Sequence, residues 1–548
     1  MTSSDRPRSG ESSPPRAVPI SRAAFLRGAA AAVAGGVAFP LLSACSSSGS
    51  SATGSSGSST GTAAAATGGA TGTTLSSADI ATIKKFLGPI DAKSAGAGET
   101  WKIGAVMPFS TSGSVYGEVF GNGAKLAVDH IKQLGGPDIQ IDFRDSAGSD
   151  VVKVRNAFVA FAGLPAVLSS YEAAGTIAKD LIAKNHNFSI DPGGGNAPPG
   201  EGVPYYWGMR ANWGIDGFKL QGTYFAKQLK KPKMVLVFYN VGAASTQYTN
   251  AAKALLAEGG AEVVNVVLAQ AGATDYSNEL SSIRASGDFD AVSLGIDGSD
   301  IAYFLKQYQT SGIGKPIVTW DGMLAPTAKI AGQSAYENVY LGGIDAFAAN
   351  SPNPWAQIMV RTYQAKFGTN GFPGATPDYE SAGYYDAAFL LWRLYRDVKA
   401  KGGNVNDGAQ IQAALEANPT TVGIKGGTAT AAGTYQFDLT THGLKHIPMG
   451  FYQVRNGTPV LLATSDIGGA DIKILGLPAL KPARPGPGEG AGPTGCCGLS
   501  RCPRATRGSA PRHASAARGS VPAALMARNH LVLSAARTLE ATLSVAGL

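Results

Sequence analysis

The sequence predicts an α/β protein with parallel sheets, folded as two lobes of similar build. Two observations favour this fold class. From Trp101 onward, short apolar runs alternate with segments of amphipathic helical pattern, which is typical of parallel strands joined by helices. The alternation occurs in two successive series, and a chain of 548 residues with 44% hydrophobic residues is long enough for at least two cores.

The first series opens with a predicted strand at Lys102–Met107 and a helix that ends at Gly135 and Gly136. One face of this helix is apolar and has helical spacing: Phe120, Ala124, Ala127, Ile131 and Leu134. Further strands of this series are predicted at Ile139–Phe143, Ala166–Leu168 and Phe188–Ile190.

The second series predicts another parallel sheet. Its strands are expected at Met234–Phe238, Val263–Val267, Ala291–Leu294 and Ile317–Thr319, with helices near 245–257, 277–285 and 300–311. Long helices follow near 354–367 and 380–399, and short strands with turn signals run from Tyr435 to Leu462. The folded body is expected to end near Leu480.

The N-terminal 44 residues have the pattern of a signal peptide. Five arginines precede an uncharged apolar run, Gly28 to Leu42, which is shorter than the ~20 residues that a membrane-spanning helix needs. Leu42-Ser43-Ala44-Cys45 resembles the bacterial lipobox, which implies cleavage before Cys45 and a lipid on its thiol. Residues 21–27 resemble the twin-arginine export motif, but Ala23 replaces its second arginine.

Two segments are too biased in composition to form a core. Residues 46–77 are almost wholly Ser, Gly, Thr and Ala, so residues 45–98 are interpreted as a lipid-anchored flexible tether. Residues 481–548 are rich in Pro, Gly, Ala and Arg and are interpreted as a disordered tail. Cys496, Cys497 and Cys502 in that tail lack the spacing of a zinc site, and no cysteine occurs between residues 46 and 495.

The distribution of charge argues against a nucleic-acid partner. Of the formal net charge of +8, residues 1–44 account for +3 and residues 482–548 for +6, so the residues between them carry −1. A nearly neutral body has no electrostatic footprint for a phosphate backbone. We therefore expect small-molecule ligands.

The sequence offers no convincing nucleophile, phosphate or metal motif, so no enzyme activity, cofactor or metal is expected. The glycine motifs at 57–61 and 490–495 lie in biased segments with no strand before them. His442 and His446 are four residues apart, but Gly443 and Pro448 disfavour a helix there. We interpret them as satisfied or solvated histidines.

Several separated motifs occur in order between about Trp101 and Leu480. They are Ile103 to Ser110, Ser112-Gly113, Tyr116-Gly117, Gly123-Ala124, Leu126 to Val128, Gly135-Gly136, Tyr205 to Trp207 with Arg210, Leu305 to Gln307 with Gly312, and Asp321-Gly322. In these motifs the chain resembles the type I periplasmic solute-binding proteins of ABC importers, in particular the branched-chain amino-acid binding group.

This resemblance implies two Rossmann-like lobes joined by three hinge crossings. Lobe 1 would comprise residues 99–215 and 345–447, and lobe 2 residues 216–344 and 448–480. Ligand would be held between the lobes at the carboxyl ends of strands, where backbone N–H groups and helix dipoles suit polar groups.

The resemblance also implies candidate ligand-binding residues. Ser112 and Tyr116 fall on the first strand–helix loop, and Tyr116 on an aromatic that packs on the ligand. Gly193, Gly194 and Gly195 fall on the loop whose amides hold the ligand carboxylate, and Glu172 stands where a serine binds the same group. Asp321 falls on the acid that pairs with an α-amino group. Asp297 stands where a pocket aromatic is usual. Another pocket tyrosine is replaced by Ala243 or Ala244, and Tyr239 or Tyr248 could fill its role.

These departures change the expected ligand. An ionised Glu172 beside a ligand carboxylate repels it. With Glu172, Asp297 and Asp321 in the pocket, an amine, a cation or a hydroxyl-rich solute is favoured over a simple aliphatic amino acid. Asp297 and Asp321 also have a plainer interpretation, since Asp297-Gly298 and Asp321-Gly322 are common turn pairs.

The expected function is that of a monomeric, lipid-anchored substrate-binding subunit on the outer face of the membrane. It would capture an amino acid or related polar solute and deliver it to the permease subunits of an ABC importer. The alternative is a ligand-sensing module of a signalling receptor, which needs a membrane span or signalling domain downstream. Arg528 and Arg537 interrupt the apolar stretch from Val521 that would otherwise supply such a span.

Overall fold

The computed structural model separates into two units, Met1–Gly488 and Glu489–Leu548. The described residues all belong to the first unit; they are 74–110, 114–147, 150–170, 177–193, 203–210, 213–240, 242, 245–296, 298–319, 325–368, 379–466 and 471–477. The predicted signal peptide, Cys45 and the predicted tail lie outside these ranges.

Within the described residues, which begin at residue 74, two short helices precede the first strand. They are α2 (Ser77–Leu87) and α3 (Ala92–Ala95). Ser76 caps α2 and forms a capping box with Asp79, in which each side chain accepts a bond from the other residue's backbone N–H. Ile83 of α2 is fully buried, and Arg361 forms an ion pair with Asp79 at 2.8 Å. The folded part therefore begins before residue 99, and the structure departs from the tether boundary predicted at residue 98.

Sheet A contains five described strands, all parallel, in the order β2-β1-β3-β4-β5. They are β1 (Thr100–Met107), β2 (Asp138–Asp145), β3 (Ala166–Leu168), β4 (Phe188–Asp191) and β5 (Tyr206–Gly208). The connecting helices are α4 (Ser114–Gln133), α5 (Val151–Ala160) and α7 (Lys179–Asn185). Strands β3, β4 and β5 are wholly buried, as expected for a parallel sheet covered on both faces.

Sheet B repeats this plan and adds antiparallel strands. Its parallel part has the order β7-β6-β8-β9-β10, which matches the order of sheet A strand for strand. The strands are β6 (Lys233–Tyr239), β7 (Glu262–Ala269), β8 (Ala291–Gly295), β9 (Ile317–Thr319) and β10 (Tyr340–Asp345). The helices are α8 (Trp213–Ala226), α9 (Ser245–Glu258), α10 (Ser277–Arg284), α11 (Gly298–Thr310), α12 (Ala325–Ala331) and the 3-10 helix at Gln333–Tyr336.

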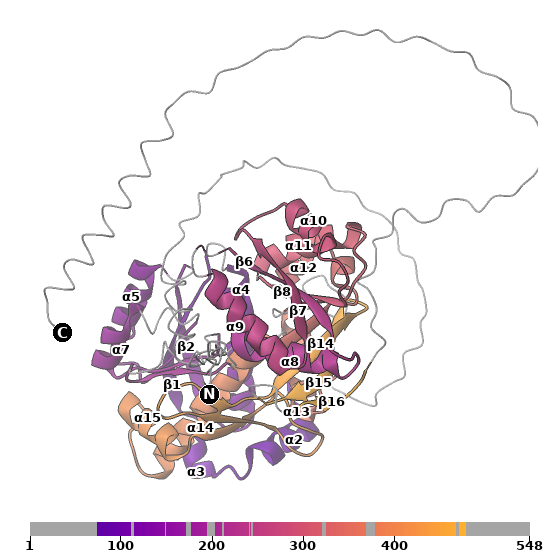
Figure 1. The fold of residues 1–548 in the computed structure, drawn as a ribbon. Helices are drawn as coiled ribbons and strands as arrows, with labels where there is room; N and C mark the ends of the chain where they lie inside the picture. Colours follow the sequence, from indigo (N-terminus) through magenta and orange to yellow (C-terminus); the bar gives the residue numbers. More distant parts are fainter. Residues whose placement is uncertain are drawn as a thin grey trace, which may run out of the picture. The chain divides into compact units, whose positions relative to one another are not determined.

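The C-terminal part of the chain is shared between the two sheets. Helices α13 (Pro354–Phe367), α14 (Tyr379–Ala400) and α15 (Gly408–Ala417) pack with the elements of sheet A. So does the small antiparallel sheet of β11 (Thr420–Gly423), β12 (Gly433–Phe437) and β13 (Leu444–His446). Strands β14 (Met449–Arg455), β15 (Thr458–Ser465) and β16 (Lys473–Ile474) extend sheet B beyond β10, as the yellow strands of Figure 1 show.

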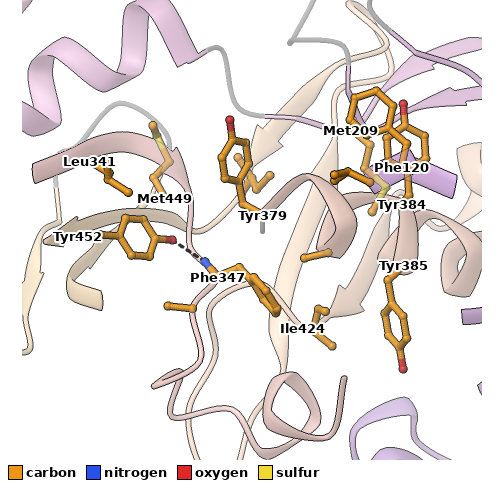
Figure 2. Packing of buried hydrophobic residues seen from close by; sticks show 14 of the residues in the cluster. Phe120, Met209, Leu341, Phe347, Tyr379, Tyr384, Tyr385, Ile424, Met449 and Tyr452 are labelled. Carbon is orange, nitrogen blue, oxygen red and sulfur yellow. Dashed lines mark hydrogen bonds between the residues drawn. The ribbon is translucent and has the colours of Figure 1, made fainter. Parts of the chain in front are cut away.

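The chain passes between the two sheets three times within the described residues: from β5 to α8, from β10 to α13 and from β13 to β14. The last two passages are bonded to each other, because Ala346 N–H donates to the carbonyl of Pro448 at 2.8 Å. Tyr452 strengthens this junction, since its hydroxyl donates to the Asp345 carbonyl and accepts from the Phe347 amide, each at 2.5 Å (Figure 2). The two-lobed α/β fold predicted from the sequence is confirmed.

Candidate functional site

The strand order locates the site before any side chain is considered. In a doubly wound sheet of order 2-1-3-4-5, ligands bind at the carboxyl ends of the strands, beside the point where the order reverses. That point lies between β1 and β3 in sheet A and between β6 and β8 in sheet B. The predicted residues Ser112, Tyr116, Glu172 and Asp297 all follow one of these four strands in the sequence.

Tyr116 links the two reversal points. It lies in the first turn of α4, its side chain is half-buried, and its ring centroid is 6.1 Å from that of Phe120. A Cβ atom at Gly298, the first residue of α11, would lie only 3.6 Å from the Tyr116 hydroxyl. The loop after β1 and the helix after β8 therefore meet at this tyrosine, where the sequence predicted a ligand-contacting aromatic.

A single carboxylate fixes the segment between β1 and α4. Asp145, at the end of β2, accepts bonds from the backbone of Phe109 and Ser110, from the Ser110 hydroxyl at 2.6 Å and from Lys153 at 2.8 Å. Burial opposes its charge, but these bonds together hold the pKa of the Asp145 carboxyl well below its usual range. The start of the loop that carries Ser112 is thus tied to the neighbouring strand.

Tyr384, on α14, supports the loops that follow β3 and β4. Its hydroxyl donates to the carbonyl of Ser169 at 2.7 Å, and its ring stacks on Phe120 with centroids 4.4 Å apart (Figure 2). A Cβ atom at Gly193 would lie 2.9 Å from the same hydroxyl, so a side chain at this position requires Tyr384 to move. The absence of a side chain at Gly193 therefore has a packing reason in addition to any role in ligand binding.

Arg210 lies on the first passage between the sheets and is buried together with Glu380. Its guanidinium forms an ion pair with Glu380 at 2.9 Å and donates to the Gly193 carbonyl and the Tyr379 hydroxyl, each at 3.2 Å. Asp191 is also buried and accepts bonds from the Tyr206 hydroxyl at 2.5 Å and the Gly193 amide at 3.1 Å. The described residues at this edge of sheet A therefore include two buried carboxylates and one buried guanidinium.

The corresponding edge of sheet B is organised around Asp300. Its carboxylate accepts bonds from the Tyr239 hydroxyl at 2.9 Å and from the Gly272 amide at 2.8 Å. Burial raises the pKa of the Asp300 carboxyl, although these two bonds oppose the shift. Tyr239, which ends β6, is thus held in place, whereas Tyr248 is buried within α9 and its ring lies 6.3 Å from that of Phe238.

The structure describes two of the predicted ligand-binding residues, Tyr116 and Gly193, and brings both close to the aromatic pair of Phe120 and Tyr384. The remaining predicted residues lie outside the described ranges: Ser112, Glu172, Gly194, Gly195, Asp297, Asp321 and the lipidation residue Cys45. Within the described part of the chain, no group of His, Cys, Asp and Glu side chains could hold a metal ion, and no helix is both long and apolar enough to cross a membrane.

Sequence reasoning missed the polar residues that support the site. The sequence predicted Arg210 only as one of the residues that match the family. It predicted no role for four other residues: Asp145, Tyr379, Glu380 and Tyr384. A charged residue directly after a buried strand, as in Trp207-Gly208-Met209-Arg210, was the available signal for Arg210. The partners on α14 lie about 170 residues further along and only the fold reveals them.

Comparison with known proteins adds a family match. A family model described as "Periplasmic binding protein" matches residues 100–459, which is more than half of the chain. A comparison with functionally curated proteins finds no significant match.

Several solved structures share the fold. The branched-chain amino-acid transporter substrate-binding protein LivJ from Streptococcus pneumoniae, in complex with isoleucine, is 21% identical, with a TM-score of 0.54, covering 67% of this chain and 99% of that one. An ABC transporter substrate-binding protein from Sphaerobacter thermophilus is 21% identical, with a TM-score of 0.55 and coverage of 68% and 99%. A solute-binding protein from R. palustris, in complex with 4-hydroxybenzoate, is 15% identical, with a TM-score of 0.54 and coverage of 68% and 99%.

Proposed function

Since the chain belongs to the periplasmic binding protein family, we propose that it is the substrate-binding subunit of an ABC importer and works outside the cytoplasm. The observation that carries this proposal is the meeting of the two reversal points, where the Tyr116 hydroxyl lies 3.6 Å from the Cβ position of Gly298. Two equivalent sheets that face each other through such loops can close on a solute by a hinge motion about the three passages.

The proposed ligand is an amino acid, an amine or a related small polar solute. In the described residues at the carboxyl edge of sheet A, Asp191 and Glu380 outnumber Arg210. The predicted pocket residues Glu172, Asp297 and Asp321 add three acidic groups. An acidic surrounding favours a cationic or hydroxylated group over a second carboxylate.

The proposed attachment is a lipid on Cys45, after removal of residues 1–44 as a signal peptide. Residues 46 to 73 would then separate the lipid from the folded part, and residues 481–548 would form a disordered tail. Intact mass of the protein from its natural host tests the cleavage and the lipid. A chain that begins at Cys45 with an added diacylglycerol supports the anchor, whereas an unprocessed N-terminus contradicts it.

Thermal unfolding of the purified chain tests the binding function. The probes are isoleucine, isoleucinamide, 4-hydroxybenzoate and polyamines. A probe present at 100 times its Kd stabilises the folded state by about 2.7 kcal/mol. We expect isoleucinamide, which is a cation without a carboxylate, to raise Tm at least as much as isoleucine. The acidic-pocket hypothesis is contradicted if isoleucine binds more tightly than isoleucinamide and Glu172→Ser leaves its binding unchanged. If no probe raises Tm, the protein does not bind these classes of ligand.

Two variants locate the binding site. Tyr116→Ala is expected to reduce the shift produced by the best probe, because it removes the aromatic ring between the two edges. The matched control is Tyr205→Ala, since Tyr205 is also a half-buried tyrosine but precedes β5 and stacks on His186 at the opposite end of the sheet. Equal loss of probe binding in both variants would place the site elsewhere.

A further inference from the structure

Arg210 connects three segments that are distant in the sequence. The residue follows β5, its carbonyl partner Gly193 follows β4, and its partners Tyr379 and Glu380 form the first turn of α14. Arg210 and Glu380 are 7% and 2% exposed, so water screens their attraction little. The guanidinium is therefore held in one orientation by a carboxylate, a carbonyl and a hydroxyl.

The first turns of α14 also contact the other loops of the site. Tyr384 binds the Ser169 carbonyl, stacks on Phe120 and lies against Gly193, as described above (Figure 2). Phe120 in turn lies beside Tyr116. The segment Tyr379–Tyr384 thus touches or supports the segments that follow β1, β3 and β4, and Arg210 is the charged group that binds this segment to the first passage.

We propose that Arg210, paired with Glu380, is a positioning residue for ligand binding, which rests on the proposed function. It sets the distance between Gly193 and the start of α14, and so fixes where the backbone after β4 meets a solute. Arginine suits this role because its planar guanidinium has five N–H donors in a fixed arrangement and can serve three acceptors at once.

A purely structural ion pair is the competing explanation. A buried ion pair seldom stabilises a fold more than apolar residues of the same volume, because both charges lose their hydration. If the pair only stabilises the fold, its removal should raise amide exchange throughout lobe 1. If the pair positions the site, its removal should raise amide exchange mainly in the backbone next to Gly193 and Ser169. Ligand affinity should fall as well.

Hydrogen–deuterium exchange of the full chain separates the two explanations without any ligand. The test variant is the neutral pair Arg210→Gln with Glu380→Gln, which avoids an unpaired buried charge. We expect amide exchange in peptides covering 188–193 and 166–170 to rise at least tenfold, while β6 and β8 of sheet B keep their protection. Exchange unchanged in these peptides, or raised equally throughout lobe 1, would overturn the proposal.

Two further variants serve as controls. Arg393→Gln removes another largely buried arginine of α14, which binds Asp397 at 2.8 Å and the Asn418 carbonyl at 3.1 Å, and is expected to leave both peptides unchanged. Arg210→Lys keeps the charge but lacks the planar set of donors. Arg210→Lys is expected to raise exchange as the neutral pair does. If its exchange equals that of the wild type, a positive charge alone suffices, and the proposed role of the guanidinium geometry is wrong.

Calorimetric titration adds the functional readout. Isoleucine and isoleucinamide are the probes, and the neutral pair is expected to weaken whichever binds the wild type at least tenfold, with Arg393→Gln unchanged. Unchanged affinity would overturn the positioning role even with faster exchange. If neither probe binds the wild type, the ligand classes named in the proposed function are contradicted. The exchange experiment, which needs no ligand, then decides the role of Arg210.

Discussion

The ion pair between Lys425 and Asp345 is fully buried, so removing one of its charges should destabilise the fold strongly. Lys425 follows β11, while Asp345 ends β10 in sheet B, so the pair joins lobe 1 to the second passage. Each residue is 1% exposed. The neighbouring backbone is bonded as well, since Gly426 N–H donates to the Ala346 carbonyl at 2.6 Å.

Lys425→Met keeps the length and apolar stem of the side chain but removes its charge. Asp345 then remains as a buried carboxylate without its cation, a change that costs about 3–5 kcal/mol in other proteins. This is a large part of the ~5–15 kcal/mol that ordinarily separates folded from unfolded domains. In the double variant with Asp345→Asn, neither charge of this pair remains to be buried, so most of the loss should be recovered.

Urea unfolding at pH 7 measures these differences. The control is Lys132→Met, because Lys132 forms an exposed ion pair with Asp138 at 2.8 Å, and such pairs contribute about 0–1 kcal/mol. We expect Lys425→Met to be several-fold more destabilising than Lys132→Met. The reasoning fails if Lys425→Met lies within about 1 kcal/mol of wild type, or if the double variant is no more stable than the single one.

Three other predictions concern pH, the N-terminal helix and a close backbone contact. Burial raises the pKa of Asp386 to about 6, so its contribution to stability is full below pH 3.8 and is lost as the pH rises through 6. Relative to Asp386→Asn, wild type should therefore lose about 2 kcal/mol between pH 4 and 7; parallel pH profiles of Tm would contradict this. Ile83→Ala should cost about 2–5 kcal/mol in denaturant unfolding because Ile83 is fully buried on α2, whereas a negligible cost would mean that α2 is not part of the fold. Gly343 has φ +89° and its Cβ position lies 2.0 Å from Gly217 Cα, so Gly343→Ala should destabilise far more than Gly402→Ala, where φ is +71° and nothing lies within 4 Å. Equal unfolding midpoints of these two variants would contradict the close contact.

Most of the sheet architecture could be predicted because parallel strands buried on both faces are continuous apolar runs. The predicted strands Met234–Phe238 and Ala291–Leu294 lie within β6 and β8, and the helix predicted at 354–367 matches α13. The prediction missed α2, which directly follows a segment of Ser, Gly, Thr and Ala and was included in the tether. Its signal was local: Ser76 and Asp79 form a capping box, and Lys84 and Lys85 lie in its last turn.

The site was less predictable than the fold, because its support depends on contacts between distant segments. The resemblance pointed to Tyr116 and Gly193, which lie in loops next to strands that are easy to recognise. Nothing near Arg210 in the sequence indicates that Glu380 is its partner, since that pairing exists only after α14 has packed against sheet A. Spacing along a sequence reveals neighbours within one helix or strand, but not across this distance.

Helix α14 relates the candidate site to the passages between the lobes. Tyr384 binds Ser169 at the site, while Asp386, two residues later, accepts the Ile424 amide at 2.9 Å beside the buried pair of Lys425 and Asp345. Residues two apart on a helix point in different directions, and Figure 2 shows Tyr384 and its neighbour Tyr385 pointing apart in this way. One turn of α14 therefore contacts both the loops of the candidate site and the junction of two passages. Because the same helix contacts both places, variants at Arg210 and at Lys425 need separate readouts: local amide exchange for the first and global stability for the second.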